Sequence, residues 1–467
     1  MSLSEAKLRE AASIAPSPRQ LAWQELEFYG FIHFGMNTFT GREWGDGRAS
    51  PALFDPARLD PGQWAAAFKS AGMQGLILTC KHHDGFCLWP SAHTDYSVKH
   101  APWKGGRGDV VAETAAACRR AGLKFGVYLS PWDRHDPRYG AGKPYDDYYV
   151  AQLTELLTGY GELFCVWLDG ACGEGANGRR QVYDWPRYYR TIRALQPGAV
   201  ISVCGPDVRW CGNEADHCRP SEWSVVPAQL RDAAYTAERS QQADDAAFAR
   251  RVDRTDEDLG SREAIAGAGA LAWYPAEVDT SIRPGWFYHP EEDGRVRTAD
   301  ELLDIYLAAV GGNAALLLNV PPALDGRLAA PDCAALAALG QKRQALFASE
   351  LTGCARLTAD SSAEGHPPAL AADGSWWQAA PGRTEAVLTL TFPQPERVSC
   401  LVLGEYLPAG QHIEAGCIEA DGRPVAAFTV VGHKRICRFA PVRARTLAVR
   451  ITASRAEPAL RLLAAYR

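Results

Sequence analysis

The chain has 467 residues, of which 47% are hydrophobic and 22% are charged, and its formal net charge is −6. This length exceeds one ordinary domain, and these proportions are typical of a globular protein rather than a disordered one. A weakly acidic chain of this size has neither the basic surface that nucleic acid requires nor a polybasic patch for a membrane, so we expect no nucleic-acid and no membrane partner.

The first two-thirds of the chain alternates short apolar segments with amphipathic ones. The apolar segments show little polar alternation, as parallel strands covered on both faces do, and they occupy residues 28–35, 75–80, 124–130, 163–169, 200–206, 222–226, 271–278 and 315–322. Amphipathic segments lie between several of them. One example begins with Asp60 and Pro61 and ends on Gly72, as a capped helix does.

About eight such units predict a (β/α)₈-like (TIM) barrel. A doubly wound α/β sheet is the alternative, but no glycine-rich phosphate-binding motif follows the first strand. Residues 236–263 are polar, with charges of both signs, and are predicted to form a surface insertion or a mobile loop.

The pattern changes near residue 350. Closely spaced strand-like segments follow, separated by Gly, Pro and Asp and with no helical period between them. They predict a β-sandwich, jelly-roll-like in character. We therefore expect a (β/α)₈-like catalytic domain over residues 1–348 and a C-terminal β-sandwich over residues 349–467.

Thirteen cysteines, an odd number scattered through apolar segments, favour free buried thiols over a disulfide framework. The first twenty residues lack the apolar core of a signal peptide, and no apolar run reaches transmembrane length. The chain as given is therefore expected to be cytoplasmic, although a leader removed earlier would leave no trace in it.

Polar residues gather where the predicted strands end, which is where (β/α)₈ barrels carry their functional groups. A single His or Asp at such a position is usually a structural donor or a turn residue, but so many on one face favour a functional site. For Trp210 and Trp223 we expect packing in the core. The residues at or just beyond strand ends are His33, Glu43, Trp44, Lys81, His82, His83, Asp84, Tyr128, Trp132, Asp133, His135, Trp167, Asp169, Asp207, Arg209, Glu214 and His217.

Three chemistries compete for this set. A metal-dependent hydrolase would use His82, His83, Asp84 and His217 as ligands, but adjacent histidines on a strand point to opposite faces, and no HxH or HExxH motif is present. A serine or cysteine hydrolase lacks a GxSxG motif, and Cys172 has no evident histidine partner.

The third chemistry is glycoside hydrolysis by paired carboxylates. It needs an ionised nucleophile, a protonated acid and sugar-binding aromatic residues, which Asp169, Glu214 and their surroundings supply. The 14 tryptophans suit sugar stacking, although large cores would explain them as well.

Seven motifs in a fixed order make the sequence recognisable. The chain carries FIHFGMNTF, EWGDG, GLILTCKHHDGFCLWPS, KFGVYLSPWDRH, VWLDGA, GPDVRWCGNEA and DTSIRPGWFYH between residues 31 and 289. Together they resemble the retaining α-L-fucosidases, and in particular the branch that prefers α-1,3- and α-1,4-linked fucose.

The resemblance implies a role for each matching position. Asp169 in VWLDG matches the nucleophile, and Glu214 in GNEA matches the acid/base of this branch. Trp286 in RPGWFYH matches an aromatic residue beside the methyl group of the sugar. The other positions that enclose the fucose are matched by His33, Glu43, Trp44, His82, His83, Tyr128 and Trp167.

The resemblance therefore implies an exo-acting α-L-fucosidase whose substrate is a fucosylated oligosaccharide and which needs no metal and no organic cofactor. A retaining mechanism would proceed through a covalent fucosyl-enzyme, with the two carboxyl groups roughly 5–5.5 Å apart. Two alternatives stay open: a non-catalytic fucose-binding protein on the same scaffold, and a metal-dependent barrel hydrolase. No oligomeric state is predicted.

Overall fold

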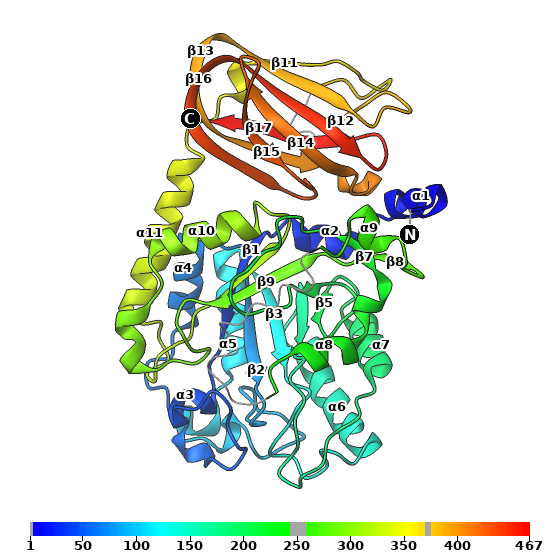
Figure 1. Ribbon diagram of the computed structural model, residues 1–467. Coiled ribbons are helices and arrows are strands. Elements are labelled where there is room, and N and C mark those ends of the chain that lie inside the picture. The colour runs from blue at the N-terminus through cyan, green and yellow to red at the C-terminus, as the bar shows by residue number, and fades with distance from the viewer. Residues whose placement is uncertain (1–2, 243–257, 369–374) are drawn as a thin grey trace.

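The computed structural model describes residues 3–242, 258–368 and 375–467, which form a parallel β-barrel and an antiparallel β domain beside it (Figure 1). Within these ranges the barrel sheet has eight strands in the order β5-β4-β3-β2-β1-β10-β9-β6. A parallel bridge between Ser202 and Val208 brings the two ends of this sheet together, so the predicted (β/α)₈-like barrel is confirmed. The strands are β1 (Phe28–Ile32), β2 (Gly75–Lys81), β3 (Lys124–Leu129), β4 (Cys165–Leu168), β5 (Val200–Val203), β6 (Arg209–Trp210), β9 (Ala276–Ser281) and β10 (Ala315–Asn319).

Helices surround the barrel and connect its strands. In α4 the Asp60 side chain accepts the Gln63 N–H at 3.0 Å, Pro61 opens the helix and Gly72 ends it with φ +81°, as the sequence predicts. Such an N-cap stabilises a helix by about 1 kcal/mol. The helices outside the C-terminal domain are α1 (Glu5–Ser13), α2 (Pro18–Gln24), α3 (Met36–Thr40), α4 (Pro61–Ala71), α5 (Val110–Ala121), α6 (Lys143–Gly159), α7 (Trp185–Leu195), α8 (Ala233–Arg239), α9 (Arg262–Ile265), α10 (Ala299–Ala309) and α11 (Ala330–Leu346).

The sixth predicted strand was placed wrongly, and the seventh was correct only in part. Residues 222–226 do not join the barrel, because β7 (Val225–Pro227) pairs antiparallel with β8 (Leu271–Trp273) in a separate two-stranded sheet. Pro227 lacks an N–H and so suits a sheet edge. The sixth barrel strand is β6, whose two residues are too short to produce a periodic signal, and the predicted strand 271–278 divides between β8 and the start of β9.

The prediction for residues 236–263 is also corrected in part. Helix α8 extends into this segment as far as Arg239, and α9 begins at Arg262, so both ends of the segment are helical. Residues 243–257 lie outside the described residues. The polar composition of this segment therefore gave no indication of the two helix ends within it.

The C-terminal domain is an antiparallel β-sandwich, as predicted. Two long strands, β13 and β16, pair along most of their length and take part in both layers. In one layer β11, β14 and β15 join them, and in the other β12 and β17 do. The strands are β11 (Arg356–Ala359), β12 (Trp377–Gln378), β13 (Ala386–Glu405), β14 (Ile413–Ala420), β15 (Arg423–Phe428), β16 (Arg435–Ser454) and β17 (Ala459–Tyr466).

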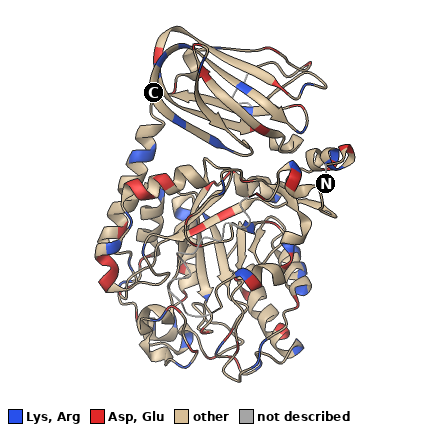
Figure 2. Cartoon of the chain, viewed as in Figure 1, with Lys and Arg blue, Asp and Glu red and all other residues tan. Residues whose placement is uncertain are grey.

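The sandwich packs on the end of the barrel opposite the carboxyl ends of β2–β4 (Figure 1). The His433 N–H donates to Asn313 Oδ1 at 2.6 Å, and an antiparallel bridge joins Gly312 to Arg435. The exact domain boundary after residue 348 stays a prediction. Acidic and basic residues are interspersed on both domains (Figure 2), and in the described ranges no helix is both long and apolar enough to cross a membrane.

Candidate active site

A pocket opens among the loops at the carboxyl ends of the barrel strands. Its empty volume is about 550 Å³, counted with its open mouth, which is within the range of small-molecule sites. Eight of the ten predicted site residues line it, namely His33, Trp44, His82, His83, Trp167, Asp169, Glu214 and Trp286. The remaining lining residues are Phe31, Gly170, Ala171, Val203, Trp210, Ser240, Gln241 and Asp279.

Asp169 directly follows the fully buried strand β4. The Ala171 N–H donates to its Oδ1 at 2.7 Å and the Tyr128 hydroxyl donates to its Oδ2 at 2.8 Å. Burial raises the pKa of Asp169, but both donors oppose that rise because they stabilise the charged form. The next residue is Gly170, and a larger residue there would crowd its neighbours because a Cβ would lie 2.1 Å from Ser240 Oγ.

Glu214 lies on the irregular loop after β6. The Trp286 indole N–H donates to its Oε2 at 2.9 Å. Burial raises the pKa of Glu214 to about 7; the indole N–H opposes this rise, whereas the carboxylates of Asp169 and Glu43 add to it. A carboxyl group with this pKa is partly protonated near neutrality and can both give and take a proton.

The hydrogen bonds of His33 assign its protonation. The side-chain N–H groups of Asn319 donate to Ser281 Oγ at 3.0 Å and to the Trp286 carbonyl at 2.8 Å, so Asn319 Oδ1 must face His33. His33 Nδ1 lies 2.9 Å from that oxygen and therefore carries the proton. Burial lowers the pKa of His33 to about 3, so Nε2 of the neutral ring is a hydrogen-bond acceptor.

The same reasoning applies to His83. Ser130 Oγ donates to the Trp132 carbonyl at 2.7 Å and so accepts from His83 Nδ1, 2.8 Å away. His83 Nε2 is then an acceptor, and it lies 3.8 Å from Asp169 Oδ2. Burial lowers the pKa of His83 to about 3. Two neutral histidines thus offer acceptors to a hydroxyl-rich ligand.

His82 and His83 both line the pocket because β2 ends at Lys81. Beyond that residue, neighbouring side chains need not alternate, and the two rings lie 4.1 Å apart between centroids. Burial, with the nearby His83 and His33, lowers the pKa of His82 well below its ordinary value, which keeps this ring neutral as well.

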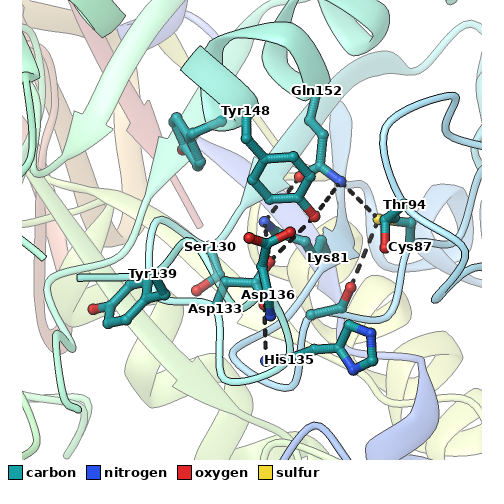
Figure 3. Close-up of polar contacts among 12 residues, drawn as sticks. Lys81, Cys87, Thr94, Ser130, Asp133, His135, Asp136, Tyr139, Tyr148 and Gln152 are labelled. Carbon is teal, nitrogen blue, oxygen red and sulfur yellow. Dashed lines mark hydrogen bonds and ion pairs between the residues drawn. The ribbon is translucent and has the colours of Figure 1, made fainter. Parts of the chain in front are cut away.

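A buried ion pair joins Lys81, the last residue of β2, to Asp133 in the loop that follows β3 (Figure 3). Lys81 Nζ donates to Asp133 Oδ2 and to Gln152 Oε1, each at 2.9 Å. Asp133 Oδ1 also accepts two backbone N–H groups of the loop that follows β3. This loop carries Trp132, whose ring lies 4.9 Å from that of His83.

Glu43 and Tyr128 are close to the pocket without lining it. Glu43 accepts the backbone N–H of Trp286 at 2.9 Å and that of Phe287 at 3.2 Å, and it lies 2.8 Å from His289 Nε2. It thereby holds the segment that carries Trp286. Tyr128 contacts Asp169 through its hydroxyl group.

Of the eight lining residues that were not predicted as site residues, four have side chains with polar groups: Trp210, Asp279, Ser240 and Gln241. Trp210 was expected in the core, but it lines the pocket and its indole N–H donates to Asp279 Oδ1 at 2.8 Å. Asp279 lies near the end of β9 and opens the DTSIRPGWFYH motif, so both its position and its motif could have identified it. Ser240 and Gln241 follow α8 in the segment predicted to be a surface loop, and no sequence signal marks them.

The pocket does not bring together the residues that a metal-dependent hydrolase or a cysteine hydrolase would use. Asp84, His217 and Cys172 lie outside the residues that line this pocket. In the part of the chain that the structure describes, no three His, Cys, Asp or Glu side chains are grouped so that they could hold a metal ion. All thirteen cysteines are described, and none forms a disulfide.

Comparison with known proteins agrees with this geometry. Residues 10–342 match the family model described as Alpha-L-fucosidase. This chain belongs to the α-L-fucosidase family. It is therefore a glycoside hydrolase whose catalytic fold is the barrel described above.

Relatives extend the family match over nearly the whole chain. Alpha-L-fucosidase 1 of Arabidopsis thaliana is 38% identical over 470 residues, which cover 97% of this chain and 87% of the relative. A solved structure from Bacteroides ovatus is 44% identical with a TM-score of 0.86, over 99% of this chain and 75% of that one. A fucosidase of Ruminococcus gnavus, solved in complex with fucose, is 26% identical with a TM-score of 0.82, over 100% of this chain and 99% of that one.

Proposed function

We propose that this α-L-fucosidase removes terminal α-1,3- or α-1,4-linked L-fucose from oligosaccharides by a retaining double displacement. Asp169 is the nucleophile and Glu214 is the acid/base. The observation that carries the proposal is that these two carboxyl groups line one pocket in contrasting surroundings. Burial raises the pKa of both groups, but Asp169 receives a hydroxyl and a backbone N–H that favour its charged form, whereas the pKa of Glu214 is raised to about 7. Contrasting surroundings of this kind divide acid from nucleophile in glycosidases.

In the first step an oxygen of ionised Asp169 attacks the anomeric carbon of fucose. The bond from that carbon to the leaving-group oxygen breaks, and Glu214 gives its proton to this oxygen. The product is a covalent fucosyl ester of Asp169. His33 Nε2 and His83 Nε2 are acceptors on neutral rings, so they can bind sugar hydroxyls without forming an ion pair with Asp169.

In the second step ionised Glu214 removes a proton from water, whose oxygen attacks the same carbon. The ester bond to Asp169 breaks, fucose leaves with its original anomeric configuration, and both carboxyl groups return to their starting states. The aromatic residues around the pocket, Trp44, Trp167 and Trp286, suit the apolar face and methyl group of the sugar. The linkage preference rests on the resemblance of the GNEA motif to the branch that cleaves α-1,3 and α-1,4 bonds.

The test compares fucose release from α-1,2-, α-1,3- and α-1,4-fucosylated trisaccharides with EDTA present throughout. We expect rapid release from the α-1,3 and α-1,4 substrates and slow release from the α-1,2 substrate. Equal rates on all three would remove the linkage proposal. Fucose binding without release from any substrate would indicate a binding protein, and loss of activity in EDTA would indicate a metal-dependent hydrolase.

A further inference from the structure

A second cavity adjoins the catalytic pocket and shares two of its lining residues. Glu214 and Trp286 line both hollows. The second cavity has an empty volume of about 730 Å³, counted with its open mouth, which is sufficient for a sugar residue. Three arginines also line it: Arg283, Arg295 and Arg297.

Two of these arginines are engaged by carboxylates. Arg283 is buried and binds Asp332 through Nε and Nη2, at 2.9 to 3.1 Å, and Asp293 through Nη2 at 2.8 Å. Its charge is thus compensated, so we regard it as part of the scaffold. Arg297 binds Asp216 through Nη2 at 2.7 Å.

Arg295 differs from both. It is exposed, and within the described residues its guanidinium group forms no hydrogen bond and no ion pair. Arg297 also retains a free terminal nitrogen there, because its contacts with described residues use Nε and Nη2. The wall of the cavity therefore carries one positive charge that no carboxylate of the described residues contacts as an ion pair, and one further guanidinium donor.

The proposed reaction indicates which part of the substrate occupies this cavity. The proton of Glu214 goes to the oxygen between fucose and the next sugar, so that sugar must lie against Glu214. Resting on the proposed role of Glu214, we propose that this second cavity binds the leaving-group sugar and that Arg295, assisted by Arg297, favours a leaving group with a carboxylate or sulfate group. A guanidinium group binds such groups through two parallel hydrogen bonds.

The size of the preference follows from a single exposed charge. Arg283 and Arg297 are paired with carboxylates, and Glu292 lies close enough to Arg295 to interact with it. A charge-assisted contact at an exposed site then corresponds to about a three- to tenfold preference, which decreases with ionic strength.

The experiment uses three fucosylated trisaccharides that differ only in the sugar next to fucose: neutral, sulfated, or carrying a uronic acid carboxylate. We would measure kcat and KM for the wild type, Arg295→Ala, Arg295→Lys and the control Arg190→Ala, which removes an exposed arginine of α7. The wild type should have a lower KM for an anionic substrate than for the neutral one. Arg295→Ala should abolish the preference, Arg295→Lys should retain part of it, and Arg190→Ala should leave it intact. Comparison of the sulfated substrate with the uronic acid substrate identifies which anionic group the cavity binds.

Calorimetry with the corresponding anionic disaccharides without fucose separates this proposal from the proposed function. Binding that Arg295→Ala weakens, in a protein that releases no fucose, would sustain the subsite and refute the catalytic proposal. A wild type without preference for an anionic substrate, or a preference that Arg295→Ala leaves unchanged, would overturn the subsite.

Discussion

The two carboxyl groups of the pocket are held by different kinds of structure. Asp169 directly follows the buried strand β4, and its donors are a backbone N–H of its own loop and a tyrosine of the neighbouring strand β3. Glu214 lies on an irregular loop, and its donor is the indole of Trp286, a residue 72 positions away in the sequence. The regular barrel thus positions one group, and contacts between loops position the other.

The pKa values of the two groups therefore depend on different parts of the molecule. Burial raises the pKa of both groups, but the hydroxyl of Tyr128 and a backbone N–H oppose this rise at Asp169, whereas at Glu214 the nearby carboxylates of Asp169 and Glu43 add to it. Changes at β3 should therefore act on the nucleophile, and changes in the loop of Trp286 should act on the acid/base.

The largest effect should separate the two roles. Asp169→Ala should lose at least about 10³-fold in kcat on every substrate, since no covalent bond can form. Glu214→Ala should lose about 10²–10⁴-fold on oligosaccharides but much less on an aryl fucoside whose phenol leaves without protonation. Steady-state rates on both substrates test this. The exposed carboxylate variant Glu162→Ala should behave as wild type, and equal losses for Glu214→Ala on both substrates would contradict its role.

The ion pair behind β2 should matter for stability. Lys81→Met leaves Asp133 buried without its partner and should destabilise the fold by about 3–5 kcal/mol. Urea unfolding measures this change. The double variant Lys81→Met with Asp133→Asn should recover part of the loss, because no buried charge is then left alone; a double variant less stable than Lys81→Met would contradict this account.

On the strand side, Tyr128→Phe should move the acid limb of the pH–activity profile. The tyrosine hydroxyl stabilises ionised Asp169, so its removal raises the pKa of the nucleophile and shifts the acid limb up by about one pH unit. The profile of kcat/KM between pH 4 and pH 9 tests this. Tyr149→Phe, which removes a hydroxyl that donates to the Leu129 carbonyl, is the matched control and should leave both limbs in place.

On the loop side, Trp286→Phe should move the opposite limb by a smaller amount. The indole N–H lowers the pKa of Glu214, so its removal raises that pKa and shifts the alkaline limb up by about half a pH unit. The acid limb should stay in place. A shift of the acid limb instead would mean that Trp286 acts on Asp169.

Sequence reasoning recovered the regular part of this site better than the irregular part. Asp169, His33 and Trp167 lie at ends of barrel strands, where hydrophobic pattern and topology alone predict a functional position. Glu214 lies after the two-residue strand β6, which has no periodic signal, and only its motif identified it. Ser240 and Gln241 reach the pocket by the packing of α8, a tertiary effect that a polar sequence does not encode locally.

The central claim is that Asp169 forms the covalent bond and Glu214 handles the proton. The most direct test is the anomeric configuration of the fucosyl azide formed when azide rescues each alanine variant, determined by NMR. Azide should replace the missing nucleophile in Asp169→Ala and give the β-azide by a single inversion. In Glu214→Ala it should attack the fucosyl-enzyme and give the α-azide by a double inversion. The same anomer from both variants, or the two anomers exchanged, would contradict the assignment.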